Sequence, residues 1–295
     1  MSFILNQEER YGIVDETESN VWDMVQMAKD KQINCPTSIQ GIIEGGSECI
    51  QLMKDLLEWG KLSDAAKYLI PFEKISWLSP LPTPRKNIMC VGKNYRDHAI
   101  EMGSEADIPE HLMVFTKAPT AVTGHENQIS AHGQITSELD YEGELAIIIG
   151  KKGREIERAK AFDYIFGYTI LNDITARDLQ TRHKQFFIGK SLDTSCPIGP
   201  WIVQKDELPN PNQIKIMTSV NGEIRQDSNT KHFIFPIDEI ISVLSAGMTL
   251  EPGDIIATGT PAGVGKGFKP PRYLSSGDEI EITIEGIGKL NNIVK

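Results

Sequence analysis

The fold of this 295-residue chain is decided by one stretch, Glu-Gly-Glu-Leu-Ala-Ile-Ile-Ile-Gly at residues 142–150. Its β-branched residues and the glycine that ends it are typical of a core strand. Residues two apart on a strand point to the same face, with a rise of about 6.6 Å between them. We therefore expect Glu142 and Glu144 to lie on one face at the beginning of this strand.

Asp173 follows a second apolar run, residues 166–171. Three carboxylates at the ends of two core strands would repel one another unless a cation lay between them. All-oxygen ligation suits Mg²⁺ or Mn²⁺, which keep coordination positions for water or substrate. Two simpler interpretations stay open, because Glu142 and Glu144 could form a solvated strand face and Asp173 could cap a helix.

The charge balance limits the partners of the chain. It has 30 Lys and Arg against 41 Asp and Glu, a formal net charge of −11. An acidic surface disfavours nucleic acid and anionic membranes, and an anionic substrate then needs a local positive centre. The four cysteines form no Cys-x-x-Cys motif, which argues against a zinc ribbon, a redox motif or a disulfide scaffold. No secretory signal and no run of about 18 apolar residues is found, so the sequence predicts a cytoplasmic protein.

The sequence predicts two domains, a small N-terminal α/β domain at residues 1–80 and a larger one at residues 85–295. Between them, Pro80, Pro82 and Pro84 predict an extended linker, because proline cannot donate a backbone hydrogen bond.

Within the first domain, residues 11–15 predict a strand and a turn. A first helix is predicted from a 3.6-residue spacing of four residues, Val21, Met24, Val25 and Ala28. A second helical region follows Ser38 and is interrupted at Gly45-Gly46.

The second domain alternates short apolar runs with Gly and Pro turns. Strands are predicted at residues 87–91, 145–149, 166–171, 200–203, 214–220, 255–258 and 280–284. Helices are predicted near residues 158–161, 176–183 and 237–245. Many strands with few helices favour an α+β, predominantly β fold of the roll or barrel type over a doubly wound sheet.

His98 and Glu101 are three residues apart in a segment that follows the strand at 87–91. One helical turn places them side by side, and a carboxylate beside an imidazole orients the ring as a base that activates water. Gly103 and Pro109 suggest that this segment is a mobile lid. The simpler alternative is an ordinary surface pair.

Two further segments are candidates for binding a carboxylate. Lys190 lies among small and apolar neighbours, where its ammonium could steady an enolate or simply pair with Asp193. Residues 258–267, Thr-Gly-Thr-Pro-Ala-Gly-Val-Gly-Lys-Gly, resemble a phosphate loop but lack its glycine and its final Ser or Thr. Backbone N–H groups in such a turn can still hold a carboxylate, or the glycines can serve a tight turn only.

Taken together, these motifs resemble the fumarylacetoacetate hydrolase family. The resemblance covers residues from Arg85 onward and is specific because five motifs occur in order. The motifs are Gly-Lys-Asn-Tyr at 92–95 with His98 and Glu101, Asp-Tyr-Glu-Gly-Glu at 140–144, Asn-Asp-Ile-Thr-Ala-Arg-Asp at 172–178, Gly-Lys-Ser-Leu-Asp at 189–193, and Thr-Gly-Thr-Pro-Ala-Gly-Val-Gly at 258–265.

The resemblance implies the family's mixed β-sandwich roll, a homodimer, and a role for each matching residue. It implies Mg²⁺ or Mn²⁺ ligands at Glu142, Glu144 and Asp173, and catalytic residues at His98, Glu101 and Lys190. It implies substrate binding by Arg177, Gly259 and Thr260, although a structural role for Arg177 stays open. The sequence departs from the family at Phe186, where many relatives carry Trp, and a fourth acidic ligand cannot be placed.

The implied activity is metal-dependent cleavage of a C–C bond in a small 2-oxo acid. The leading prediction is oxaloacetate decarboxylation, because the resemblance is to bacterial members linked to that reaction. The alternatives are an acylpyruvate (fumarylpyruvate-type) hydrolase, a 2-hydroxyhepta-2,4-diene-1,7-dioate isomerase, and a non-catalytic regulatory protein that binds partners through its N-terminal domain.

Overall fold

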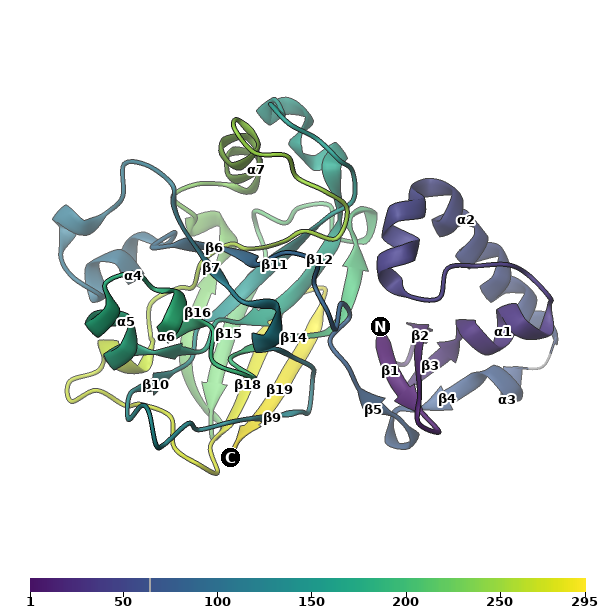
Figure 1. Cartoon of the computed structure of the whole chain (residues 1–295), viewed down its shortest axis with the longest axis horizontal. Helices are drawn as coiled ribbons and strands as arrows, with labels where there is room; N and C mark the ends of the chain where they lie inside the picture. The colour runs from purple at the N-terminus through teal and green to yellow at the C-terminus, as the bar shows by residue number, and fades with distance from the viewer. Residues whose placement is uncertain (64) are drawn as a thin grey trace.

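The computed structural model describes residues 1–63 and 65–295 (Figure 1). A larger β-rich body occupies the left of the figure, and a smaller one formed by the N-terminal residues lies at its right. About 32% of the residues are in strands and 29% in helices. The predicted α+β, predominantly β fold is therefore confirmed.

The stretch at 142–150 forms the centre of a seven-stranded sheet. β11 (Gly143–Ile149) is buried along its whole length and pairs antiparallel with β12 (Ile165–Asn172) and β17 (Ile255–Ala257). The sheet has the order β7-β6-β17-β11-β12-β14-β8. Its other strands are β6 (Ile88–Gly92), β7 (Met113–Lys117), β8 (Val122–Thr123) and β14 (Cys196–Gln204). The sheet is mixed, because β6 runs parallel to β17 and β8 runs parallel to β14.

A second sheet of five strands packs against one face of the first. Its order is β16-β15-β18-β19-β9. The strands are β9 (Gln128–Ile129), β15 (Lys215–Val220), β16 (Glu223–Asn229), β18 (Glu279–Ile284) and β19 (Gly288–Val294). Alternate residues of β11, Leu145, Ile147 and Ile149, share one hydrophobic core with β18. The period of two along a strand thus places the odd-numbered side chains of β11 between the two sheets.

The remaining elements of the larger body cap its ends. β10 (Leu139–Asp140) and β13 (Thr175–Ala176) form a two-stranded ribbon. The α-helices are α4 (Arg96–Glu101), α5 (Arg177–His183), α6 (Phe187–Lys190) and α7 (Ile237–Ser245). The 3₁₀ turns are η2 (Glu105–Asp107), η3 (Pro119–Ala121), η4 (Arg158–Tyr164), η5 (Lys205–Glu207), η6 (Thr230–His232) and η7 (Gly265–Gly267).

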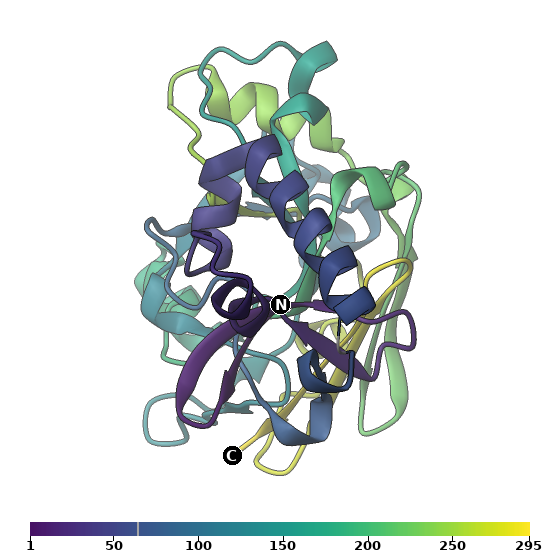
Figure 2. The same cartoon turned by 90° about the vertical axis from the view of Figure 1, so that its right-hand side faces the viewer.

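The N-terminal residues form a sheet of their own with helices packed beside it (Figure 2). The strand order is β4-β3-β2-β1-β5. The strands are β1 (Ser2–Leu5), β2 (Glu8–Val14), β3 (Asn20–Asp23), β4 (Leu69–Pro71) and β5 (Ser76–Trp77). The helices are α1 (Met24–Asp30), α2 (Ile39–Ser63), α3 (Ala65–Tyr68) and the 3₁₀ turn η1 (Phe72–Lys74).

This N-terminal part shares a hydrophobic core with the seven-stranded sheet. Ile42 and Ile43 of α2 lie in the same buried cluster as Ala146 and Ile148 of β11. Ala146 and Ile148 of β11 therefore face the N-terminal helices. The division into residues 1–80 and 85–295 remains a proposal.

All seven predicted strands of the second domain are present, and α7 has the predicted bounds. Two details were wrong. Val21 lies in β3 and not in a helix, because Asp23 caps α1 by accepting a hydrogen bond from the backbone of Gln26. Residues 158–161 belong to a 3₁₀ turn. The interruption at Gly45-Gly46 is confirmed, since Gly46 has a φ of 59° inside α2. Among the helices described, none is both long and apolar enough to cross a membrane.

The buried imidazole of His125, between β8 and β9, should make the free energy of unfolding depend on pH. It is 7% exposed and packs against Trp77, and its Nδ1 accepts a hydrogen bond from the backbone of Asn291. Burial lowers the pKa of His125 from 6.5 to about 4. Above pH 6.5 both the folded and the unfolded state carry a neutral ring. Between pH 6.5 and 4 only the unfolded state takes up the proton, so this residue destabilises the fold by up to about 3 kcal/mol as the pH falls.

The measurement is urea unfolding of the wild type and of His125→Asn between pH 4 and 8. The asparagine carbonyl can accept the same backbone hydrogen bond but does not titrate. The difference in unfolding free energy between the two proteins should change over this range in favour of the variant at low pH. Parallel curves for the two proteins would contradict the assignment.

Candidate metal centre and active site

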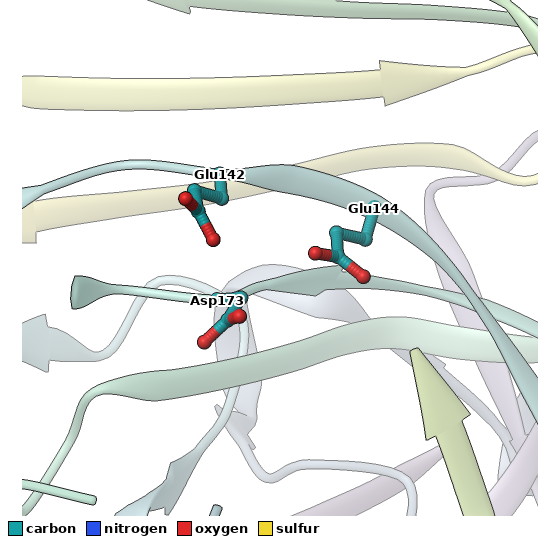
Figure 3. Close-up of side chains that lie close together, drawn as sticks. All are labelled: Glu142, Glu144 and Asp173. Atoms are coloured by element: carbon teal, nitrogen blue, oxygen red, sulfur yellow. The ribbon is translucent and has the colours of Figure 1, made fainter. Parts of the chain in front are cut away.

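Three carboxylates gather where β11 and β12 meet (Figure 3). The antiparallel register pairs Gly143 with Asn172, so Asp173 lies across from Glu142, and its backbone N–H donates to the carbonyl of Glu142 at 2.9 Å. One carboxylate oxygen from each of Glu142, Glu144 and Asp173 lies within 4.8 Å of the others. Their residues are 4%, 1% and 0% exposed, which excludes a solvated strand face.

Two lysines bind this group of carboxylates. The ammonium of Lys190 donates to Glu142 and to Asp173, each at 2.6 Å. The ammonium of Lys117, at the end of β7, donates to the other oxygen of Asp173 at 2.7 Å. Lys190 therefore does not pair with Asp193, and the Asp173 carboxylate takes part in this cluster and does not cap α5, whose N-cap is Ala176.

Glu142 and Glu144 have opposite electrostatic environments. Burial alone would raise the pKa of Glu142, but the charges of Arg177 and Lys190 hold it below its ordinary value. Glu144 has no ion pair among the described residues, and its carboxylate accepts a hydrogen bond from the backbone N–H of Gly259 at 2.7 Å. Burial and the negative charges of Asp173 and Glu142 raise its pKa well above the ordinary value. Glu144 thus lacks a cation.

The donor set fits a hard divalent cation. Three carboxylate oxygens within 4.8 Å of one another can converge on one ion. Each oxygen that already accepts a hydrogen bond keeps a second lone pair for coordination. Glu144 has no ion pair among the described residues, and a bound cation would favour its ionised form.

His98 and Glu101 form a pair on α4, next to the carboxylates. His98 Nδ1 lies 3.3 Å from Glu101 Oε2. Their side chains are 7% and 17% exposed, so this is not an ordinary surface pair. Since Nδ1 faces Glu101, Nε2 is the ring nitrogen left for a substrate.

The loop at residues 258–267 holds carboxylates of the protein itself through its backbone. Besides the bond from Gly259 to Glu144, the N–H of Gly263 donates to Glu101 at 2.9 Å. The N–H groups of Gly265 and Lys266 donate to Asp140 at 2.6 and 3.0 Å. Gly259 and Gly263 have φ values of 98° and 107°, a region that favours glycine. The loop therefore fixes the metal-ligand candidate and the His98 partner together.

Several residues of this site line a small cavity. Its volume is about 170 Å³, and its lining includes Glu142, Glu144, His98, Lys190 and Thr260. Four large apolar side chains also line it: Met102, Met113, Phe115 and Phe186. Pockets for drug-sized ligands are typically about 300–1,000 Å³, so this cavity suits a small organic acid.

Of the three predicted substrate-binding residues, only Arg177 and Thr260 line the cavity. The guanidinium of Arg177 donates to Asp140 at 2.9 Å and to Glu142 at 2.6 Å, which favours a structural role. The Thr260 hydroxyl donates to the carbonyl of Gly143 and accepts from Gln226. The N–H of Gly259 is directed to Glu144.

Sequence reasoning missed three residues of the site. Lys117 ends a strand that was not predicted, and Gln226 lies on β16, which was also missed. Asp140 was noted only as part of a motif. Its signal was its position two residues before Glu142, but Arg177 and Gly265, which bind its carboxylate, lie 37 and 125 residues away in sequence.

A family model matches the part of the chain that contains this site. The model for the fumarylacetoacetate (FAA) hydrolase C-terminal domain matches residues 87–295, more than half of the chain and every candidate site residue. The chain belongs to the fumarylacetoacetate hydrolase family. The family prediction is thereby confirmed.

Named relatives are similar over most of this family member. Oxaloacetate tautomerase YisK of Bacillus subtilis is 56% identical over 259 residues, 87% of this chain and 86% of the relative. The structure of a fumarylacetoacetate hydrolase from Exiguobacterium antarcticum has a TM-score of 0.84 at 42% identity and covers 100% of this chain and 98% of its own. A 2-hydroxyhepta-2,4-diene-1,7-dioate isomerase from Mycobacterium marinum has a TM-score of 0.65 at 38% identity, over 78% and 81% of the two chains. The prediction that the chain is an enzyme of this family is confirmed.

The opposite environments of the two glutamates predict opposite effects of the same substitution. In protein treated with a chelator at neutral pH, Glu142→Gln should lower the unfolding free energy by about 3–5 kcal/mol, because it removes one of the two buried carboxylates that each of Arg177 and Lys190 binds. Glu144→Gln should leave stability unchanged or raise it, because burial and two neighbouring carboxylates already favour the uncharged form of Glu144 in the metal-free protein, and glutamine is uncharged too.

Both variants should lose affinity for Mn²⁺, measured by calorimetry. Chemical unfolding gives the stability of each metal-free protein. An equal loss of stability in the two variants would mean that Glu144, like Glu142, is stabilised by a buried cation, which would contradict the prediction.

Proposed function

We propose that this enzyme acts on oxaloacetate and interconverts its keto and enol forms, with decarboxylation to pyruvate as a second outcome of the same site. The observation that supports this most is the cavity of about 170 Å³ lined by Glu142, Glu144 and His98. Asp173 lies directly beside the two glutamates. The 56% identical relative named as an oxaloacetate tautomerase supports the same substrate.

We propose Glu142, Glu144 and Asp173 as the ligands of one Mg²⁺ or Mn²⁺ ion. Bound there, the ion would supply Lewis-acid polarisation of the 2-keto oxygen. The Lys190 ammonium, which already bridges Glu142 and Asp173, adds positive charge where the keto oxygen becomes negative. The apolar residues of the cavity limit the access of water.

His98 is the proposed base for tautomerisation. Its Nε2 takes a proton from C3, and the electron pair of that C–H bond becomes the C2–C3 double bond while the keto oxygen gains negative charge. The imidazolium then returns the proton to that oxygen, which gives the enol. Glu101, held by the Gly263 N–H, orients the ring and stabilises its charged form.

Decarboxylation makes a different demand on the same residues. The C3–C4 bond breaks, CO₂ leaves, and the electron pair of that bond becomes the C2–C3 double bond of the pyruvate enolate. No proton is removed and no water attacks, so His98 is not needed for bond cleavage. Hydrolysis of an acylpyruvate instead requires His98 to activate water.

The alternatives remain an acylpyruvate hydrolase and a 2-hydroxyhepta-2,4-diene-1,7-dioate isomerase, as the Mycobacterium marinum structure is named. The small cavity favours the four-carbon acid over the longer substrate.

We also propose, from the family resemblance, a cytoplasmic homodimer. The regulatory alternative would show as full biological effect from a Glu142→Ala variant without turnover.

Steady-state assays of the purified protein with Mn²⁺ test the substrate. Enol absorbance in the ultraviolet follows tautomerisation, and a coupled dehydrogenase assay follows pyruvate release. We expect turnover of oxaloacetate with kcat/KM at least tenfold above that for acetylpyruvate, and loss of activity with a chelator. Turnover confined to acetylpyruvate would refute the proposal.

The His98→Ala variant separates the reactions at this site. Removing a general base typically costs 10²–10⁴-fold, so we expect tautomerisation to fall by about that factor. Decarboxylation should stay within about tenfold of the wild type, because its bond cleavage needs no base. A parallel loss of both activities would show that His98 serves more than proton transfer.

A further inference from the structure

Lys93 is the cationic side chain of the cavity that has no buried partner. Four residues that can carry positive charge line the cavity: Lys93, His98, Arg177 and Lys190. Arg177 and Lys190 bind the buried carboxylates Glu142, Asp140 and Asp173, and His98 pairs with Glu101. Among the residues that the structure describes at this cavity, Lys93 is the cation whose carboxylate partner is the most exposed, Asp107 at 44%.

The position of Lys93 is fixed by its backbone. It directly follows β6, and its φ of 52° lies in the left-handed region, which is uncommon for a residue with a side chain. Residues in that region persist where the surrounding structure holds them, and they are frequent at ligand sites. The Lys93 side chain is 25% exposed, so it borders both the cavity and solvent.

The partner of Lys93 is a carboxylate on the segment that follows α4. Its ammonium lies 3.3 Å from Asp107 Oδ1, and the Asp107 side chain is 44% exposed. Asp107 is held on η2 by the backbone N–H and the hydroxyl of Ser104, each at 2.9 Å. Lys93 thus lines the cavity, and its ammonium binds a carboxylate that is not part of the cavity lining.

This ion pair is weak enough to exchange. Pairs between partly exposed side chains contribute little stability, whereas the ion pairs of Lys190 with Glu142 and Asp173 involve side chains at most 6% exposed. An incoming anion can therefore displace Asp107 from Lys93 far more easily than it can displace Glu142 from Lys190.

We propose that Lys93 binds the distal carboxylate of a dicarboxylic 2-oxo acid in place of Asp107 and so selects such acids over 2-oxo acids without a second negative charge. The inference rests on the proposed function, in which the other end of the substrate lies at Glu142, Glu144 and Asp173. A four-carbon diacid carries one negative charge at each end, and Lys93 supplies the cation that the second one needs.

The test is the Lys93→Met variant, which keeps the length and the β-carbon of the side chain and removes its charge. Lys151→Met is the matched control, because Lys151 is an exposed lysine that lies just past the far end of β11. Each protein is assayed with Mn²⁺ on oxaloacetate, and oxalate serves as an inhibitor that has no distal carboxylate beyond its chelating end.

We expect Lys93→Met to raise KM for oxaloacetate at least tenfold with kcat within threefold of the wild type. The inhibition constant of oxalate should stay within twofold, which also shows that the variant is folded. Asp107→Asn, which removes the competing carboxylate, should lower KM for oxaloacetate. Lys151→Met should change none of these values.

An unchanged KM in Lys93→Met would overturn the inference, and so would an equal weakening of oxaloacetate and oxalate, since that would mean general damage to the site. A higher KM in Asp107→Asn would mean that Asp107 only holds the segment in place, and it would overturn the exchange. Failure of the proposed function is distinguishable, because it shows in the wild type as absence of oxaloacetate turnover.

Discussion

The site depends on the backbone N–H groups of residues 258–267, which hold three carboxylates from three different parts of the chain. Glu144 comes from β11, Glu101 from α4 and Asp140 from β10. Asp140 binds Arg177, and Arg177 binds Glu142, so one connected set of hydrogen bonds runs from the metal-ligand candidates to the partner of His98. The loop can do this because Gly259 and Gly263 adopt positive φ. Residue 263 must also lack a β-carbon, since one would lie 1.9 Å from the carbonyl oxygen of Arg225. The relative positions of base and metal centre are therefore set by main-chain geometry, which is stiffer than side-chain contact alone.

Charge balance explains why this buried cluster can exist and why it suits its proposed ligand. Four buried carboxylates, Asp140, Glu142, Glu144 and Asp173, meet three buried cations, Lys117, Arg177 and Lys190. When all four carboxylates are ionised, one negative charge is left over, and Glu144 is the group without an ion pair among the described residues. A divalent cation would convert this surplus into one positive charge, which matches one carboxylate of a chelating 2-oxo acid. The second carboxylate of a diacid would then need a cation elsewhere. Lys93, whose ion pair with Asp107 is exchangeable, is the proposed source of that cation.

The sequence predicted those parts of the molecule whose signals are local. The apolar run of β11, the i,i+3 spacing of His98 and Glu101, and the amphipathic helix α7 each follow from neighbours in the chain. The N-terminal sheet was largely missed because its strands are short, and β3 leads directly into α1, so a helical spacing seemed to begin at Val21. Lys117 was missed for another reason. Its role depends on Asp173, 56 residues away, and a lysine after an apolar run carries no mark of being fully buried.

The N-terminal part completes the larger body, and this argues against its use as a free contact surface. The even-numbered side chains of β11 need cover on the face away from the second sheet, and the apolar residues of α1 and α2 provide it within one buried cluster. Ile39, Ile42 and Ile43 of α2 are at most 9% exposed, so the face that a partner would recognise is already packed. Glu144 has the same parity along β11 as Ala146 and Ile148, which that cluster contains. The N-terminal helices therefore bury the face of β11 that carries Glu144 two residues before Ala146.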